Sequence, residues 1–481
     1  MRPVARSIGL GVTLLALAAC NSLGPDYARP ALIENDIGAP DIAFSTPAPP
    51  SPRALAAGPW WSGFGDPVLN DLVPRALKDN PDILQAQSLV RQAKADAVQV
   101  RSDGLPSLDG STSVTGDSRR AWTDGPGRGS GTGPDGNGQP EVATDAGLEA
   151  RYEVDLFGAQ DRREQASAAR IREAEADLTQ TQSDVSAEVV TTYLTLRGTQ
   201  TRLALARDSL ALQRQTRDLV QGRVTAGLAP ELDLTRARAA VQGLEADLIL
   251  LESAIRRIEV EISVLLGQPP GQVAGLLASG PGVLPRMDFA PEVGVPADLL
   301  RNRADLQAAE AALIAATAEI GVAEAALYPS LTLPGSLRFG VSGLGGETIV
   351  ATVLGSLGAV LDIPLLDFGA RRAGITIAQE EALQAALSYR AALLSALEEV
   401  ETALIDLDAA RQRRAALARA VATAQQADAQ ARALYAQGLA SFQDVLDTQR
   451  DLTATLQDEA VAALEEAQAL ADLSAGLGVN L

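Results

Sequence analysis

Apolar positions recur every three or four residues along a long stretch of the chain, which is the spacing of one face of a coiled-coil helix. Ala159 to Ala226 contains no proline, and as one helix it would span about 100 Å at 1.5 Å per residue. Gly227-Leu228-Ala229-Pro230 follows and suits a tight reversal, because glycine ends helices in the left-handed conformation and proline favours a helix start. The apolar positions after this break are Leu234, Ala237, Val241, Leu244, Leu248, Leu251, Ile255, Ile258, Ile262 and Leu265. We predict two long helices that run back to back.

In other parts of the chain the apolar period is two, as in a β-strand with one apolar face. In the first pair of such segments the apolar or small positions are Leu108, Gly110, Thr112, Val114, Ala146, Leu148, Ala150, Tyr152 and Val154. In the second pair they are Leu331, Leu333, Leu337, Phe339, Val341, Ile349, Ala351, Val353, Leu357, Ala359, Leu361 and Ile363. Charged residues such as Glu149, Arg151 and Glu153 alternate with them. The pattern predicts four strands.

These strands could simply pack on the core of a soluble domain. Their charged opposite face and their length of about ten residues instead favour a tilted membrane crossing. Hydrocarbon forbids open sheet edges, so such strands must close into a barrel. The smallest barrels of this kind have about eight strands, and we therefore expect several chains to share one barrel.

The chain is an internal duplication. Gly227-Leu228-Ala229 recurs as Gly438-Leu439-Ala440, and Leu105-Pro106 recurs as Tyr328-Pro329. The first copy has a longer insert between its strands, from Trp122 to Pro140, that is rich in Gly, Pro and Asp. Such a composition predicts a loop, and the repeat predicts one elongated architecture rather than several globular domains.

The N-terminus has the features of a signal peptide. Arg2 and Arg6 precede a short apolar run that ends in Leu17-Ala18-Ala19-Cys20. A membrane anchor is the alternative, but it needs about 20 apolar residues. Leu-Ala-Ala-Cys also resembles the bacterial lipobox, in which Cys20 receives lipid and becomes the first mature residue. The segment that follows is rich in proline and is expected to be extended.

Composition and charge exclude several classes of function. The net charge of -21 and the absence of histidine disfavour nucleic-acid binding and remove the usual general base and metal ligand. Asp367-Phe368-Gly369 matches a kinase triplet, yet it repeats Asp155-Leu156-Phe157-Gly158 of the first copy and is better explained as a strand-to-helix junction. Carboxylate pairs such as Glu398-Glu399 fit solvated helix faces. We expect no enzyme, no cofactor, no metal site and no nucleic-acid partner.

At this point the chain resembles the TolC family of outer-membrane factors, most closely its NodT/OprM-like lipoprotein branch. The likeness covers almost the whole chain. It depends on the order of several motifs, which are Leu-Ala-Ala-Cys at 17 to 20, Gly24-Pro25-Asp26-Tyr27, Trp60-Trp61, Asp66-Pro67, the two hairpin turns and Tyr435 with Gly438, Asp444 and Asp447.

The resemblance implies a mainly α fold with a membrane β-barrel. Duplicated helical hairpins from three chains would form a trimeric α-barrel, and four strands per chain would form a twelve-stranded β-barrel in the outer membrane, with the α-barrel projecting into the periplasm. The expected domains are a signal peptide (1–19), a lipid-anchored extended segment (20–67), repeat 1 (68–267), a linker and mid-height belt (268–296) and repeat 2 (297–481). In repeat 2 the first helix is expected from Ala297 to Tyr328.

The turn from Tyr435 to Asp447 is the candidate periplasmic gate. Asp444 and Asp447 lie three residues apart, on one face of a helix, and in a trimer each would form a ring of three carboxylates that favours cations. Two ordinary exposed aspartates are the alternative without the resemblance. Members of the family often have an arginine near Ala440, and this chain has none there.

The leading hypothesis is a passive exit duct for small toxic molecules. It would be driven by an inner-membrane pump through a periplasmic adaptor, a membrane fusion protein, that docks on the two turns Gly227-Leu228-Ala229 and Gly438-Leu439-Ala440. A periplasmic coiled-coil adaptor or scaffold lipoprotein is the rival, and a type I protein secretion duct is a further alternative. Adaptors usually have one hairpin, whereas this chain has two hairpins and strands.

Overall fold

The computed structural model describes residues 22–29, 59–117, 141–278, 280, 282–286, 303–344 and 350–478. The signal peptide, Cys20 and the insert from Trp122 to Pro140 lie outside the described residues. The chain divides into two compact units. The strand unit contains residues 1–28, 92–171 and 311–385, and the hairpin unit contains residues 29–91, 172–310 and 386–481.

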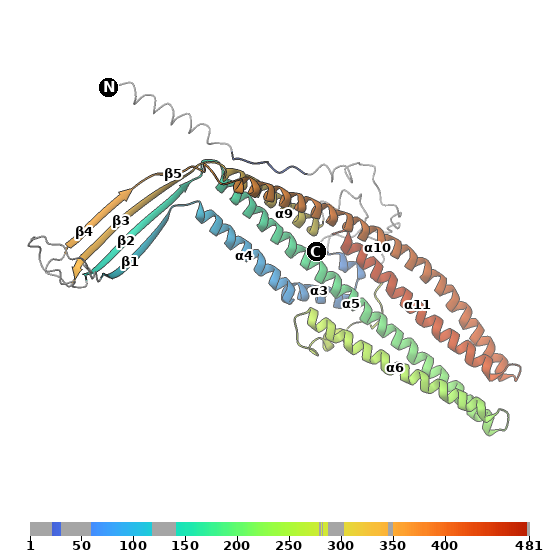
Figure 1. The fold of residues 1–481 in the computed structure, drawn as a ribbon. Helices are drawn as coiled ribbons and strands as arrows, with labels where there is room; N and C mark the ends of the chain where they lie inside the picture. The colour runs from blue at the N-terminus through green and yellow to red at the C-terminus, as the bar shows by residue number, and fades with distance from the viewer. Residues whose placement is uncertain are drawn as a thin grey trace, which may run out of the picture. The chain divides into compact units, whose positions relative to one another are not determined.

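The strand unit contains one antiparallel sheet (Figure 1). Its strands are β1 (Ser107–Asp117), β2 (Glu141–Val154), β3 (Ser330–Leu344), β4 (Val350–Leu357) and β5 (Val360–Asp362). The order is β1-β2-β3-β4, and β5 pairs with β3. The two copies of the repeat therefore meet where β2 pairs with β3.

The strand register aligns the predicted apolar positions across the whole sheet. Leu108 pairs with Ala150, Ala150 with Gly335 and Gly335 with Leu357, and further rows such as Thr112-Ala146-Phe339-Val353 lie on the same face. On the other face Asp109 lies opposite Glu149 in the strand register, and Glu149 forms an ion pair of 2.6 Å with Arg338. One face is apolar and one is polar, as the alternation predicted.

One predicted strand is divided in two. The alternation from Ile349 to Ile363 indicated a single strand, but β4 ends at Leu357 and β5 begins at Val360. The break lies opposite Pro334 of β3, which has no N–H to donate to the ladder. One hydrogen bond remains at this point, in which Gly358 N donates to the Pro334 carbonyl at 2.9 Å.

Alanines let the helices of the strand unit approach closely. Ala166 and Ala169 of α5 (Ala159–Thr225) pack against Ala315 and Ala318 of α9 (Ala304–Ala325). On a second side of α9, Ile320 packs against α10 (Ala370–Ala436). Among the described residues α9 alone is long and apolar enough to cross a membrane by length and composition, and its apolar surface packs on two neighbouring helices.

The hairpin unit is built from the two predicted hairpins (Figure 1). Helix α5 is followed by α6 (Glu231–Leu265), and α10 is followed by α11 (Phe442–Gly476). The predicted seam of α6 is buried or half-buried from Leu234 to Leu265, whereas Ile249 and Leu250 beside it are exposed. The coiled-coil prediction is confirmed for this face.

A compact core lies at the base of the hairpins. The short helix η1 (Trp60–Phe64) buries both tryptophans, and α3 (Pro67–Asp79) begins where Asp66 accepts the N–H of Val68 at 2.8 Å. Helix α4 (Pro81–Asp103) follows a break at Asn80. Together with α5, α6 and the short α7 (Ala274–Ala278), these elements enclose Leu69, Leu72, Tyr193, Leu196 and Ile262.

Candidate functional site

The two hairpin turns have the same geometry. In the first, Leu228 N donates to the Arg223 carbonyl at 2.7 Å and Gly227 N to the Val224 carbonyl at 2.9 Å. In the second, Leu439 and Gly438 repeat both bonds, to Leu434 and Tyr435. This is the Schellman ending of a helix, which requires a left-handed residue after the last turn. Gly227 and Gly438 supply it, with φ of 72° and 78°.

Both turns present an apolar tip to solvent. Leu228 and Leu439 are each 71% exposed. A Cβ added at Gly227 would meet nothing within 4 Å, so this glycine serves the turn conformation and leaves open space above it. Ala440 is half-buried against the other hairpin. The predicted docking turns are therefore small, apolar and accessible at their leucines.

The two hairpins pack on each other close to their tips. Val220, Leu234 and Ala237 come from the first hairpin, and Tyr435, Phe442, Val445 and Leu446 come from the second. The Tyr435 and Phe442 rings lie 5.9 Å apart. The sequence placed Tyr435 at the gate, and the structure places its side chain in the apolar layer between the hairpins.

Arg223 links the hairpins at this layer. Its Nη1 donates to the Tyr435 carbonyl at 2.6 Å, and its guanidinium carbon lies 4.6 Å from the centre of the Tyr435 ring. The sequence has no arginine near Ala440. Arg223, which precedes the opposite turn, links the hairpins within one chain, and no motif singled it out.

Asp444 and Asp447 share the exposed face of α11, while Phe442, Val445 and Leu446 face the other helices. Asp444 also caps α11, because its Oδ2 accepts the N–H of Ser441 at 2.8 Å and the Ser441 hydroxyl accepts the N–H of Asp444 at 3.2 Å. The Ser441 hydroxyl and N–H hold the pKa of Asp444 below its usual range. In the single chain this shift is opposite to the rise expected from a ring of carboxylates.

Glutamines of α11 join the hairpins farther from the tip. Gln449 Nε2 donates to the Thr216 hydroxyl at 2.9 Å, and Gln468 Nε2 donates to the Thr195 hydroxyl at 3.0 Å. Gln457 exchanges hydrogen bonds with Arg202. These polar links along α5 and α11 fix the register of the two hairpins within the chain.

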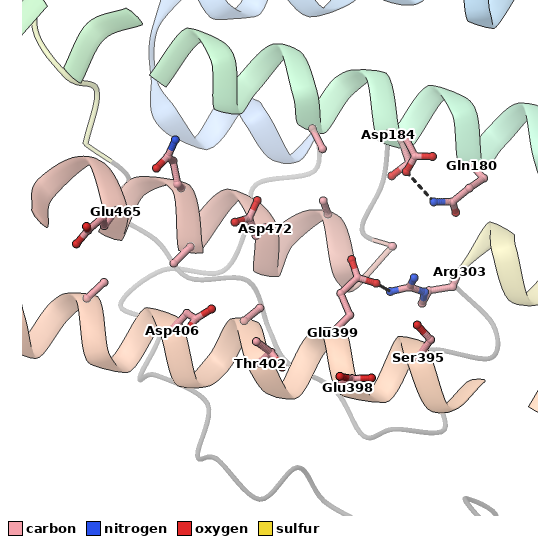
Figure 2. A pocket seen from close by; sticks show the side chains of 18 of the residues that line it. Gln180, Asp184, Arg303, Ser395, Glu398, Glu399, Thr402, Asp406, Glu465 and Asp472 are labelled. Atoms are coloured by element: carbon pink, nitrogen blue, oxygen red, sulfur yellow. Dashed lines mark hydrogen bonds and ion pairs between the residues drawn. The ribbon is translucent and has the colours of Figure 1, made fainter. Parts of the chain in front are cut away.

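An acidic groove of about 1180 Å³ lies between α5, α10 and α11 (Figure 2). Its carboxylates are Asp184, Glu398, Glu399, Asp406, Glu465 and Asp472. Arg303 enters the groove and is fully engaged. It donates to Asp305 at 2.8 Å, to Glu399 at 2.8 Å and to the Gly476 carbonyl at 2.8 Å. Arg413 pairs with Glu465.

The groove raises the pKa values of two of its carboxyl groups. For Asp472 the walls of the groove partly desolvate the carboxylate, and Glu399 and Asp406 repel its charge. Burial raises the pKa of Asp184, against a hydrogen bond from Gln180. The excess of carboxylates favours cations in this groove, but the described residues hold no group of three His, Cys, Asp or Glu with metal-binding geometry.

The sequence therefore identified the turns and the exposed carboxylates but not the contacts that hold them. Ser441 had a readable signal, since Ser-x-x-Asp at a helix start resembles a capping box. Arg223 had none, because Tyr435 is far away in the sequence. Arg303 had only its neighbour Asp305, since Glu399 and Gly476 are also far away. Cys20, the predicted lipidation site, lies outside the described residues.

The chain matches a described family over most of its length. The profile of the family described as outer membrane efflux protein matches residues 72–268 and 295–479. Nodulation protein T of Rhizobium leguminosarum bv. trifolii is 30% identical over 472 residues, which cover 96% of this chain and 95% of that protein.

Two further relatives show the same likeness. The pyoverdine export outer membrane protein OpmQ of Pseudomonas aeruginosa is 31% identical over 461 residues, covering 93% of this chain and 92% of that protein. The solved structure of the outer-membrane channel OprN is similar with a TM-score of 0.81 and 31% identity, covering 95% of this chain and 99% of that one.

Proposed function

The chain belongs to the outer membrane efflux protein family, and from this premise we propose that it forms the exit duct of a tripartite efflux system. The duct conducts drugs or other small toxic molecules passively across the periplasm and the outer membrane. A periplasmic adaptor and an inner-membrane pump are its partners, and the pump supplies the energy. The duct itself catalyses no reaction.

The sheet is the observation that carries this proposal. It has one apolar face and one polar face, both are exposed in the single chain, and its outer strands β1 and β4 have unpaired edges. An apolar outer face with a polar inner face suits a water-filled barrel in lipid, where every edge must be paired. Four strands are too few to close one.

We infer that the barrel is shared by three copies. Three chains give twelve strands, and their hairpins form an α-barrel. The resemblance to trimeric family members selects three over two or four. The 67 residues of α5 and of α10 correspond to about 100 Å of helix each, which suits a tube that projects into the periplasm.

Purified protein in a planar bilayer tests the duct. We expect unboiled samples to run as a trimer in gel electrophoresis and reconstituted trimers to form cation-preferring, water-filled channels. A monomeric protein without channel activity would instead support the adaptor or scaffold alternative. Export of a protein rather than a small molecule in cells would favour a type I secretion duct.

We propose that Asp444 and Asp447 line the periplasmic gate. Both lie on the exposed face of α11 beside the turn, so three copies would bring six carboxylates around one axis. Replacing both by Asn should reduce cation preference and relieve block by divalent ions added at the periplasmic side. Asp444 is the third helical residue of the capping box and accepts the Ser441 N–H, and Asn keeps a side-chain oxygen at that place. Asp444→Asn therefore removes the charge and keeps the acceptor, whereas Asp444→Ala removes both. Unchanged selectivity would place the ring elsewhere.

We propose that the adaptor docks on the two turns. Each turn combines a glycine with an exposed leucine, a small apolar surface that another helical hairpin can approach. Leu228→Glu and Leu439→Glu should abolish efflux in cells while leaving the trimer and its conductance intact, because neither side chain supports the fold. Full efflux by both variants would exclude this docking site.

We also propose that Cys20 carries the lipid anchor. Intact-mass measurement of membrane-extracted protein should show a diacylglyceryl group at sulfur and an acyl group at the amine. A mature N-terminus at any other residue would exclude the anchor.

A further inference from the structure

Five residues just after Cys20 lie in a closely fitting slot of the strand unit. Leu23 N donates to the Phe157 carbonyl at 3.1 Å, at the junction between β2 and α5. The segment Ser22 to Asp26, which we call the strap, includes Gly24-Pro25-Asp26, a motif that the duct mechanism does not use. The contacts of the strap indicate recognition rather than chance packing.

Arg162 recognises the strap through three separate acceptors. Its Nε donates to the Leu23 carbonyl at 2.9 Å, its Nη2 donates to the Gly24 carbonyl at 3.0 Å, and its Nη1 lies 2.9 Å from Asp26 Oδ1. Arg162 is only 3% exposed. A cation in the first turn of a helix is unfavourable for the helix dipole. Within α5 Arg162 makes one side-chain hydrogen bond, to Gln165 at 2.8 Å, whereas three acceptors belong to the strap.

Three glycines form the slot. A Cβ at Gly24 would lie 2.4 Å from Gly321 Cα, and one at Gly321 would lie 2.5 Å from the Leu23 carbonyl oxygen. A Cβ at Gly158 would lie 2.5 Å from Ser22 Cα. No other residue type fits at these positions without moving backbone, so the strap, α5 and α9 approach as closely as the chain permits.

The second copy of the repeat serves as an internal control. Ala373 follows Gly369 at the same spacing as Arg162 follows Gly158, and Val98 precedes Pro106 at the same spacing as Gly321 precedes Pro329. Gly369 has nothing within 4 Å of its Cβ position, and Val98 is exposed. Within the described part of the chain the second junction receives no such strap, and it has neither an arginine nor a glycine at the matching positions. These two residues therefore serve the strap and not the junction.

The strap lies at the level of an apolar loop. Phe157 shares a cavity with Pro364 and Arg371, and between these two residues Leu365 and Leu366 are 90% and 74% exposed. Leucines so exposed at the helix-side end of membrane strands suit contact with lipid. Two residues of extended chain span at most about 7 Å, so any group on Cys20 stays close to Ser22.

We propose that Arg162 is the positioning residue for the lipid anchor: by holding the strap in the glycine slot, it ties the segment next to the acylated Cys20 to the strand-to-helix junction. This rests on the proposed lipidation of Cys20. The anchor is then attached to the strand unit through a held segment and not through a free linker.

A nitroxide on Ala28→Cys tests this in the full-length trimer, in a background with Arg29→Ala, because the neighbouring Arg29 is held separately by Glu310 at 3.0 Å. Ala28 is exposed and lies two residues after the strap, and the chain has one native cysteine. We expect a slow-motion spectrum in the parent and a dominant fast component after Arg162→Ala. Arg163→Ala is the matched control, because Arg163 is exposed and donates to Gln160. Arg162→Lys should be intermediate, since one ammonium cannot serve three acceptors in a fixed fork.

Gly321→Ala should release the strap without changing the charge of the protein. It provides the test of the proposal if Arg162→Ala fails to assemble. Slow-motion spectra in both variants, equal to that of Arg163→Ala, would overturn the proposal. Protein without the Ala28 substitution reports separately on the anchor, because a lipidated Cys20 cannot take the label. Labelling of that protein would show that the lipid proposal has failed, whereas channel conductance tests the duct independently.

Discussion

Removing the Arg223 guanidinium should loosen the contact between the two hairpin tips. The group makes a charged hydrogen bond of 2.6 Å to the Tyr435 carbonyl and lies over the Tyr435 ring. A hydrogen bond to a charged group contributes about 1.5–3 kcal/mol, and a partly exposed cation–π contact about 0.5–1 kcal/mol. Water replaces part of both after truncation, so we expect a net cost of about 2 kcal/mol.

A cost of about 2 kcal/mol corresponds to about a 30-fold shift towards separated tips, since 1.4 kcal/mol is tenfold. Single-channel recording in planar bilayers measures this directly. Arg223→Ala should increase the open probability or the conductance of the trimer. Arg238→Ala is the control, because it removes the same charge from the same hairpin and breaks only an exposed hydrogen bond to Gln221.

Removing only the hydroxyl of Tyr435 should not open the tips, in contrast to removing Arg223. It is buried and has no hydrogen-bond partner among the described residues, so Tyr435→Phe should leave conductance unchanged or favour the closed state slightly. Tyr435→Ala removes the ring and should open the tips. If Arg223→Ala conducts like Arg238→Ala, or if Tyr435→Phe opens the channel, the tips are held by other contacts.

Two further predictions concern the base of the hairpins. Tyr193→Phe should destabilise the protein by about 2–4 kcal/mol in thermal unfolding. The reason is that the buried Tyr193 hydroxyl donates to Asp66 at 2.7 Å and accepts from Arg197 at 2.9 Å. Tyr389→Phe is the control and should be neutral, because the buried Tyr389 hydroxyl has no partner among the described residues. The raised pKa of Asp472 means that the folded state binds its proton more tightly. Stability is therefore lost as pH rises from the ordinary value near 3.8 through the raised one. Asp472→Asn should raise the melting temperature at pH 7 but not at pH 3, and Asp458→Asn, on the same helix outside the groove, controls for the substitution itself.

The sequence predicted those parts of the fold that a repeating pattern controls. The seam of α6 and the apolar face of the sheet are periodic over many residues, and the structure buries or aligns them as expected. The break between β4 and β5 could not be read from those strands, because its cause is the missing N–H of Pro334 on their neighbour. The ends of a strand can be predicted from its own residues only where the neighbouring strand does not interrupt the hydrogen-bond ladder.

The site was less predictable for a related reason. The exposed carboxylates and glycine turns are local features, and the sequence located them. Arg223 and Arg162 differ from the many other arginines of these helices only in the partners that folding brings to them. Arg223 meets the backbone of the opposite hairpin, and Arg162 meets a segment from the start of the chain. Their roles follow from tertiary contacts that no local spacing records.

The two strand-to-helix junctions differ in a way that supports the proposed assembly of several chains. Phe157 of the first junction stacks on Tyr328 at 4.7 Å. Its counterpart Phe368 is 93% exposed and holds a φ of 51°, a conformation that costs a residue with a side chain about 1–2 kcal/mol. Leu105, which stands in the first copy where Tyr328 stands in the second, is also exposed. Among the described residues Phe157 of the first copy therefore has a ring partner from the second copy, whereas Phe368 has no such ring contact. In the proposed trimer the neighbour of Phe368 would come from the first copy of the next chain.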